Sequence, residues 1–156
     1  MESNHRTQIR SLPLYPLSYG AGLGQSSGVE TGAAVRSWVE AWQAAWVAGD
    51  PAPLDAVYAE GASFRSQPFR DLQAPPEYAE WAFGEQDEAE CWFGEPLVAG
   101  DRAAVEYWGI VRFRGADETI AGTAMLRFGP DGRVVEQRDT WNAQPGRFMP
   151  PDGWGR

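Results

Sequence analysis

A helical period of apolar side chains occupies residues 33–50. Apolar residues recur there at steps of three and four, which places three indoles on one face of an amphipathic helix. This stripe consists of Val35, Trp38, Val39, Trp42 and Trp46. Gly49 ends the helix, because glycine is the usual residue just past a helix C-terminus. We expect a second, shorter helix through Tyr58, which Gly61 ends, and a third helix that begins near Glu77.

Strand patterns dominate the rest of the chain. A short strand is expected in ASFRSQPFRD, up to Pro68, and four apolar segments separated by turn sequences follow from residue 91 onward. These segments are CWFGEPLVAG, AAVEYWGIVRFRG, ETIAGTAMLRFG and RVVEQRDTW. Consecutive strands joined by tight turns form an antiparallel meander, and helices that precede such a sheet indicate an α+β domain. A curved sheet with the long helix across its concave face would enclose a pocket for a small ligand.

One folded domain accounts for most of the 156 residues. Residues 1–30 hold prolines and a glycine/serine run without a sustained period, so we interpret them as a flexible or loosely docked arm. We assign residues 31–143 to the α+β domain and residues 144–156 to a C-terminal tail. No apolar segment reaches the roughly 18 residues that cross a bilayer, and prolines interrupt the N-terminal segment. We therefore expect a cytoplasmic protein without a membrane partner.

Charge and residue usage exclude several kinds of chemistry. The net charge of −9 disfavours nucleic acid as a partner, because phosphate binding depends on clustered basic side chains. All 13 basic residues are arginine, so no lysine is available for a Schiff base or a phosphate loop. His5 lies in the arm and Cys91 has no histidine partner, which argues against a catalytic triad and against a zinc site. Carboxylates, tyrosine, arginine and water remain, and we expect neither a metal nor an organic cofactor.

Three phrases between residues 35 and 142 resemble one superfamily when they are taken in order. They are AGDPAPLDAVYAEGASFRS, GDRAAVEYW and LRFGPDGRVVEQRDTWN. The chain resembles the nuclear transport factor 2-like superfamily, and within it the SnoaL-like polyketide cyclases and the ketosteroid isomerases. The resemblance implies a cone-shaped, curved antiparallel sheet with three N-terminal helices, a cystatin-like α+β barrel. The fold alone does not choose an activity, because it hosts enzymes and non-catalytic subunits alike.

The catalytic positions of the ketosteroid isomerases are lost in this chain. The resemblance places their general base at Ser66, their oxyanion tyrosine at Trp42 and their protonated aspartate at Ala124. None of these three residues keeps the required side chain, so steroid-type isomerase activity is excluded. Tyr58 matches a supporting tyrosine of one branch, which by itself carries no mechanism.

Asp139 matches the aspartate that serves as the base of the SnoaL-like cyclases. Strand alternation puts Asp139 on one face with Val135, Gln137 and Trp141, and the resemblance implies that this face lines the pocket. An acid beside an indole would be desolvated, which raises its pKa toward the range useful for proton transfer. The cyclases also rely on a pocket histidine, which this chain lacks. Two alternatives therefore stay open for Asp139, a ligand anchor and a structural ion pair with an arginine such as Arg65 or Arg112.

The resulting hypothesis is an enzyme that acts on a hydrophobic, aromatic or polyketide-like small molecule. Asp139 would be the general base or acid, and Tyr107, Gln137 or an ordered water would polarise the substrate carbonyl. The small residues Gly109, Gly122 and Ala124 leave room for a ligand. The residues that we expect to bind substrate are Trp42, Tyr58, Phe64, Arg65, Ser66, Ala124 and Trp141. The alternative is a non-catalytic small-molecule-binding or dimeric assembly module of the same fold.

A homodimer through the outer face of the sheet is the expected assembly. The resemblance implies this interface, and alternation places Glu106, Trp108, Ile110 and Arg112 on that face. Exposed Trp108 and Ile110 would need cover, which a second subunit could supply.

Overall fold

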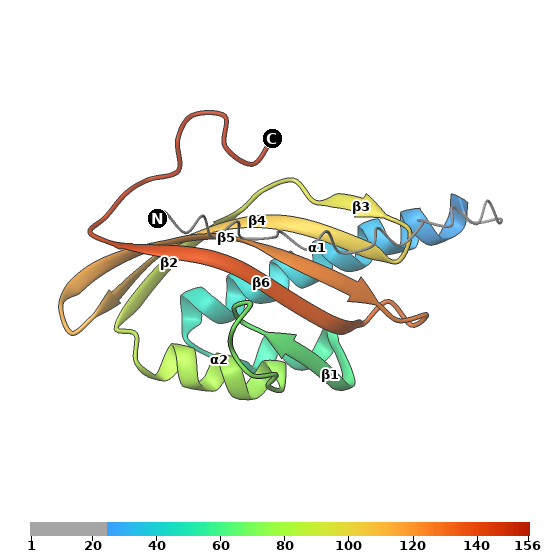
Figure 1. Ribbon diagram of the computed structural model, residues 1–156, viewed down its shortest axis with the longest axis horizontal. Coiled ribbons are helices and arrows are strands. Elements are labelled where there is room, and N and C mark those ends of the chain that lie inside the picture. The colour runs from blue at the N-terminus through green and yellow to red at the C-terminus, as the bar shows by residue number, and fades with distance from the viewer. Residues whose placement is uncertain (1–24) are drawn as a thin grey trace, which may run out of the picture.

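The computed structural model describes residues 25–156, with side chains from Glu30 onward. Residues 1–24 of the expected arm lie outside the described residues. The elements in chain order are α1 (Gln25–Ala48), the 3-10 turn η1 (Ala52–Ala56), β1 (Tyr58–Arg65), α2 (Pro75–Gly84), β2 (Glu88–Phe93), β3 (Leu97–Ala99), β4 (Arg102–Phe113), β5 (Ala116–Phe128) and β6 (Val134–Pro145). Both helices lie on the same side of one arched sheet (Figure 1). The α+β class is confirmed, and none of the described helices is long and apolar enough to cross a membrane.

The sheet is mixed rather than purely antiparallel. Its strand order is β1-β6-β5-β4-β2, and the short strand β3 pairs with β4. The meander β4-β5-β6 is antiparallel as predicted, but β1 runs parallel to β6. Alternation within a segment carries no information on the direction of a partner about 75 residues away, so the sequence pattern missed this pair. The long pairings of β4 with β5 and of β5 with β6 build the surface on which the pocket lies.

The second of the three expected helices is only a single 3-10 turn. The turn ends at Ala56 because β1 begins already at Tyr58 and pairs with β6, which leaves no room for further helical turns. Gly61 therefore lies inside a strand rather than at a helix end. It has a φ of +73°, and the β1–β6 register shifts between Tyr58 and Ser63 at the same place. The third expected helix is confirmed as α2.

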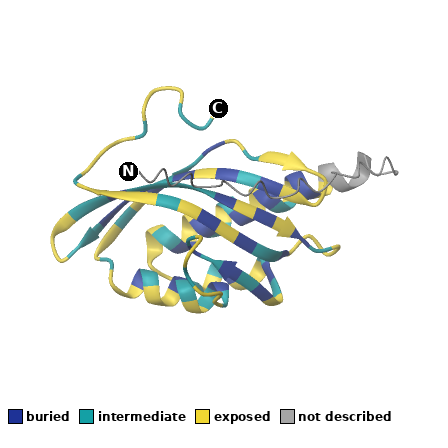
Figure 2. Ribbon diagram, in the orientation of Figure 1, coloured by how far each residue is buried: buried dark blue, intermediate teal, exposed yellow. Residues whose placement is uncertain are grey.

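Helix α1 packs its indole face against the concave face of the sheet. The predicted stripe is confirmed, because Val35 and Trp38 are almost fully buried and Trp42 is only 7% exposed. Figure 2 shows buried segments on the helix and on the strands that face it. The helix begins at Gln25, before the expected start near Ala33, and Gly32 within it is buried. Tertiary packing thus outweighs the low helix propensity of glycine in this segment.

Gly109 in β4 makes room for an indole of α1 rather than for a ligand. A Cβ atom at this position would lie 2.5 Å from Cη2 of Trp46. We expect Gly109→Ala to lower the free energy of unfolding by about 1–3 kcal/mol, because the added methyl group overlaps the Trp46 ring and forces it out of its position against β4. Urea denaturation measures the change. Gly84→Ala is the matched control, since nothing lies within 4 Å of its added Cβ. Equal stability of the two variants would contradict this packing.

The C-terminal residues cover part of the outer face of the sheet. The indole Nε1 of Trp108 donates a hydrogen bond to the carbonyl oxygen of Phe148 at 2.8 Å, and the ring of Trp154 packs against it at 6.0 Å. Ile110 is only 3% exposed within the single chain. The cover that we expected from a second subunit is thus supplied, at least in part, by the chain itself. The homodimer stays a prediction.

Candidate active site

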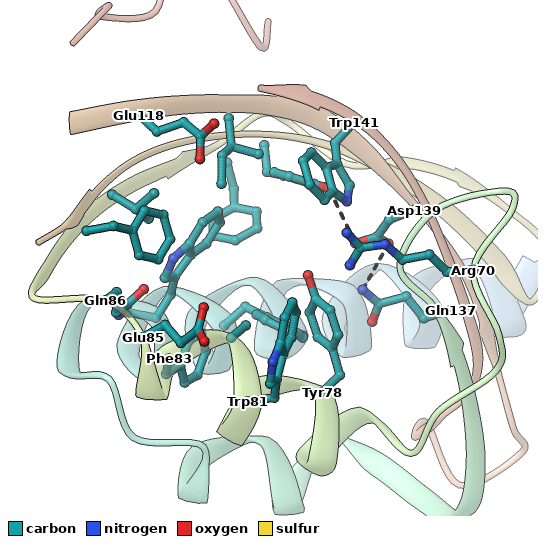
Figure 3. Close-up of a pocket in the computed structure, with 18 of the residues that line it drawn as sticks. Arg70, Tyr78, Trp81, Phe83, Glu85, Gln86, Glu118, Gln137, Asp139 and Trp141 are labelled. Carbon is teal, nitrogen blue, oxygen red and sulfur yellow. Dashed lines mark hydrogen bonds between the residues drawn. The ribbon is translucent and has the colours of Figure 1, made fainter. Parts of the chain in front are cut away.

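A cavity of about 220 Å³ lies between the two helices and the concave face of the sheet (Figure 3). Most of its wall is aromatic or aliphatic, and a few charged and polar groups project from it. The lining residues are Trp38, Trp42, Trp46, Arg70, Tyr78, Trp81, Ala82, Phe83, Glu85, Gln86, Phe93, Tyr107, Val111, Phe113, Glu118, Ile120, Gln137, Asp139 and Trp141. An apolar cavity with a few convergent polar groups is typical of a small-molecule site.

Asp139 is the buried acid of this cavity. Its side chain projects from β6 and the residue is only 9% exposed. Burial raises the pKa of Asp139 from its ordinary value of 3.8 to about 8, because the charged form loses its hydration. Hydrogen bonds from Gln137 and Tyr107 act in the opposite direction, since they stabilise the anion. Asp139 therefore changes its protonation state near neutral pH, as a general acid or base requires.

Neither arginine that we considered as an ion-pair partner reaches Asp139. The guanidinium of Arg65 donates to the backbone carbonyl of Arg70. Arg112 pairs with Asp117 at 2.8 Å and with Glu88 at 3.4 Å on the other face of the sheet. Within residues 30–156, Asp139 has no basic side chain within 4.0 Å. The described structure thus lacks the structural ion pair that was the alternative explanation of this acid.

A hydrogen-bonded network fixes the side chain of Gln137 behind Asp139. The hydroxyl of Tyr58 accepts hydrogen bonds from the indole Nε1 of Trp38 at 3.0 Å and of Trp42 at 2.7 Å. An indole N–H can only donate, so the Tyr58 hydroxyl accepts from both indoles and donates its own hydrogen bond to Oε1 of Gln137. The amide group of Gln137 is thereby oriented, and its Nε2 faces the acid.

The two carboxyl oxygens of Asp139 consequently differ. Nε2 of Gln137 donates to Oδ1 at 3.0 Å, so Oδ1 remains an acceptor in both protonation states. Oδ2 faces the hydroxyl of Tyr107 across a long contact of 3.4 Å. Burial, and then the nearby acid, raise the pKa of Tyr107 well above its ordinary value, so this hydroxyl keeps its proton. The mobile proton of Asp139 therefore belongs on Oδ2.

Five of the ten predicted site residues line the cavity. They are Trp42, Tyr107, Gln137, Asp139 and Trp141. The alternation predicted for β6 is confirmed from Gln137 to Thr140, because Gln137 and Asp139 are buried while Arg138 and Thr140 are exposed on the opposite face. It does not extend to Val135, because the β5–β6 register shifts there and Val134 is the fully buried residue. We expected the amide of Gln137 to face a substrate carbonyl, and part of it is already engaged: Oε1 accepts from Tyr58, and one N–H of Nε2 donates to Asp139. The second N–H of Nε2 is the one that a substrate carbonyl could use.

The other five predicted residues do not line the cavity. Tyr58 lies behind Gln137, and Ala124 is fully buried beside Asp139 on the neighbouring strand. Phe64 packs against Tyr78 at 4.5 Å, and Ser66 contributes its backbone carbonyl, which accepts a 2.6 Å hydrogen bond from the indole of Trp141. Arg65 is turned away from a ligand by its bond to the backbone of the following loop. These residues support the wall instead of forming it.

Sequence reasoning missed three residues at the mouth of the cavity, namely Arg70, Tyr78 and Trp81. Burial raises the pKa of Tyr78 to about 12, with a further contribution from the charge of Asp139. Arg70 places its guanidinium carbon 5.9 Å from the ring centroid of Trp81 and 5.6 Å from that of Trp141. The spacing of Tyr78 and Trp81 on the third predicted helix was the available signal, since residues three apart share a helix face.

Solved structures with this fold include several enzymes. The epoxide hydrolase/cyclase-like enzyme SalBIII of salinomycin pyran-ring formation is 15% identical, with a TM-score of 0.63 over 73% of this chain and 96% of that one. A type 2 hexachlorocyclohexane dehydrochlorinase is 13% identical, with a TM-score of 0.62 over 80% and 96%. A SnoaL-like protein of unknown function from Burkholderia thailandensis is 22% identical, with a TM-score of 0.52 over 70% and 95%. At these identities the likeness concerns the fold.

The family is shown by the sequence itself. No curated protein is significantly similar to this chain. The family model described as a SnoaL-like domain matches residues 39–137, which is more than half of the chain. The match begins within α1 and ends at Gln137 in β6, two residues before Asp139. The fold predicted from the three sequence phrases and the fold of the similar structures agree with that match. The chain therefore belongs to the SnoaL-like domain family.

Proposed function

We propose that this protein is a cofactor-independent enzyme of the isomerase or cyclase type. Asp139 would move a proton at a carbon atom beside a carbonyl group of a compact hydrophobic substrate. The observation that carries the proposal is a buried carboxyl group without an ion-pair partner in the described chain, on the wall of an apolar cavity, with a pKa of about 8. Strongly shifted carboxyl groups that face a cavity are typical of catalytic acids and bases.

The proposed step uses the geometry of the Asp139 carboxylate. Oδ2 takes the proton from the carbon, the electron pair of the C–H bond forms a carbon–carbon double bond, and the carbonyl oxygen becomes an enolate. If the substrate carries a carbon–carbon double bond next to that carbon, the enolate is conjugated with it, and return of the proton to the far end of the conjugated system shifts the double bond and completes an isomerisation. Attack of the enolate carbon on a second carbonyl, followed by protonation of that oxygen, completes a ring closure. The hydrogen bonds from Gln137 and Tyr107 stabilise the carboxylate before it takes the proton.

A tyrosine hydroxyl is the natural donor to the developing enolate oxygen. Tyr78 lines the cavity, and its hydroxyl forms no side-chain hydrogen bond within the described part of the chain. Its pKa of about 12 keeps it protonated at neutral pH. Tyr107 is the second donor, and it lies closer to the acid. Donors held in place before the reaction stabilise charge that develops in the transition state.

The size of the cavity narrows the substrate class. A closed cavity of about 150 Å³ accommodates benzene, so about 220 Å³ suits a compound of one or two rings. The aromatic wall favours a flat, apolar ring system. The cyclase-like and dehydrochlorinase relatives of the same fold support an enzyme rather than a carrier.

The pH dependence of proton exchange tests the proposal. We expect the protein to accelerate deuterium uptake at the α-carbon of small cyclic ketones, such as 1-indanone and 2-tetralone, in D2O followed by NMR. A base acts only when ionised, so the rate should rise with pH and level off above an apparent pKa of about 8. Absence of exchange above the buffer rate for the whole panel, or a rate independent of pH between about 6 and 10, would contradict the proposal.

A non-catalytic binding module is the second candidate. The replacement of three isomerase positions by Ser66, Trp42 and Ala124 favours it, as does an indole-lined cavity that suits a flat ligand. The same exchange experiment separates the candidates. A binding module would take up the ketones without accelerating the exchange of their α-protons.

A further inference from the structure

Arg70 brings a positively charged group with no acidic partner to the mouth of the cavity. Its guanidinium lies within 6 Å of the ring centroids of Trp81 and Trp141, and within residues 30–156 its side chain forms no ion pair and no hydrogen bond. Arg112, Arg127, Arg138 and Arg147 pair with glutamate or aspartate. Among the described arginines that form no ion pair, Arg70 is the one that lines the cavity. Contact with aromatic rings leaves the N–H edge of a guanidinium available for a ligand.

The loop that carries Arg70 is fastened at both ends. Backbone hydrogen bonds of 2.9 Å join Phe64 and Gln73 in both directions and close the loop. Within it, the Arg70 N–H donates to the Gln67 carbonyl at 3.1 Å, and the Arg70 carbonyl accepts from the side chain of Arg65. The indole of Trp141 is held in turn by the Ser66 carbonyl. The position of Arg70 is therefore built by the fold.

The charges along the cavity are unequally distributed. Arg70 is the only basic residue among those that line it in the described chain, and it lies at the end that holds Asp139 and Trp141 (Figure 3). Glu85 and Glu118 lie at the opposite end in the same view. Asp139, at the same end as Arg70, is mostly protonated and neutral at pH 7, because its pKa is about 8. At that pH an anionic group of a ligand is therefore repelled from the glutamates and attracted to Arg70, which sets the direction in which the ligand binds.

We propose that the cavity binds a compact aromatic keto acid, with its carboxylate on the N–H edge of Arg70 and its rings among the aromatic side chains. The proposal rests on the proposed function of the same pocket and names its substrate class. A planar guanidinium matches a carboxylate through two parallel hydrogen bonds, whereas a neutral carbonyl uses only one of them. Because Arg70 lies over the indole two residues beyond Asp139, the carbon that loses its proton lies near the carboxylate end of the substrate.

A matched pair of probes tests the recognition of a carboxylate. The anion 2-naphthoate and the neutral 2-naphthamide have nearly the same size and shape, and calorimetric titration at pH 7 compares their Kd values. We expect the protein to bind naphthoate about tenfold or more tightly than naphthamide. Arg70→Gln should remove this preference while its Kd for naphthamide stays within about threefold. Arg127→Gln on the outer face is the control and should keep the preference.

Three results would overturn the assignment of Arg70. They are equal binding of acid and amide, binding of neither, and a preference that survives in Arg70→Gln. Failure of the catalytic proposal is distinguishable, because it concerns proton exchange alone. Carboxylate preference without exchange of any α-proton keeps the assignment of Arg70 and contradicts the enzyme. Exchange of α-protons without a preference for the carboxylate keeps the proposed enzyme and contradicts the assignment of Arg70.

Discussion

We expect the substitution Asp139→Asn to lower kcat for proton exchange by about 10²- to 10⁴-fold, which is the usual contribution of a positioned general base. Asparagine has nearly the same shape and keeps an oxygen for the hydrogen bond from Gln137, but it cannot take a proton. Ligand binding should therefore change little while turnover fails. Glu136→Gln is the matched control, because it neutralises an acid of the same strand on the outer face, where it pairs with Arg127 and Arg138. Full turnover in Asp139→Asn would remove the catalytic role.

The same substitution should change the pH dependence of stability. The pKa of Asp139 is raised from 3.8 to about 8 in the fold, so folding favours the protonated form. Its contribution is fully present below about pH 4 and is lost as the pH rises toward 8, where the loss reaches about 5 kcal/mol. Asp139→Asn removes this loss. We expect equal stability of the two proteins near pH 4 and a more stable variant above pH 8, measured by urea denaturation across this range.

Tyr58→Phe is expected to lower the free energy of unfolding by about 3 kcal/mol. The substitution removes one hydroxyl and leaves three buried groups without a partner, the indole N–H groups of Trp38 and Trp42 and Oε1 of Gln137. Each unpaired buried polar group costs about 1–3 kcal/mol, partly relieved by small shifts. Tyr78→Phe is the matched control for stability, because its hydroxyl forms no side-chain hydrogen bond in the described chain. Similar losses in both variants would contradict the network.

A readout of proton transfer separates the positioning role of Tyr58 from a purely structural one. Without the Tyr58 hydroxyl, the amide of Gln137 is free to turn its oxygen toward Asp139 and repel the carboxylate. The apparent pKa of the exchange reaction should then move upward from about 8. An unchanged pH profile in a folded Tyr58→Phe protein would show that Tyr58 only stabilises the core.

Local sequence patterns were sufficient to predict the helices and strands that bury one face in the core. The indole stripe of α1 and the alternation of β6 both follow from a side chain's position relative to its immediate neighbours. For that reason the sequence placed Trp42 of α1 and Gln137, Asp139 and Trp141 of β6 around the same cavity, which they line. The raised pKa of Asp139 also followed from its expected neighbour, since desolvation beside an indole has the same direction in any fold.

Contacts between segments that are distant in the sequence could not be predicted from local patterns. The β1–β6 pair joins strands about 75 residues apart. Because this pairing was not predicted, Tyr58 was assigned to the end of a helix, although it begins β1. Phe64, Arg65 and Ser66 were expected in the cavity, but in the structure they support its wall from behind. The C-terminal cover of Trp108 likewise joins residues 40 positions apart.

The sequence by itself determined the family, the α+β class and an acid on the inner face of the last strand, because periodicity and local phrases encode them directly. Only the tertiary structure decided that Asp139 pairs with none of the arginines in the described part of the chain, that Gln137 is turned toward it by Tyr58, and that Arg70 lies at the mouth. The physical reason is that a pKa or a hydrogen bond depends on which groups share a few ångströms of space. For this site, those groups come from α1, β1, the loop after it, β4 and β6.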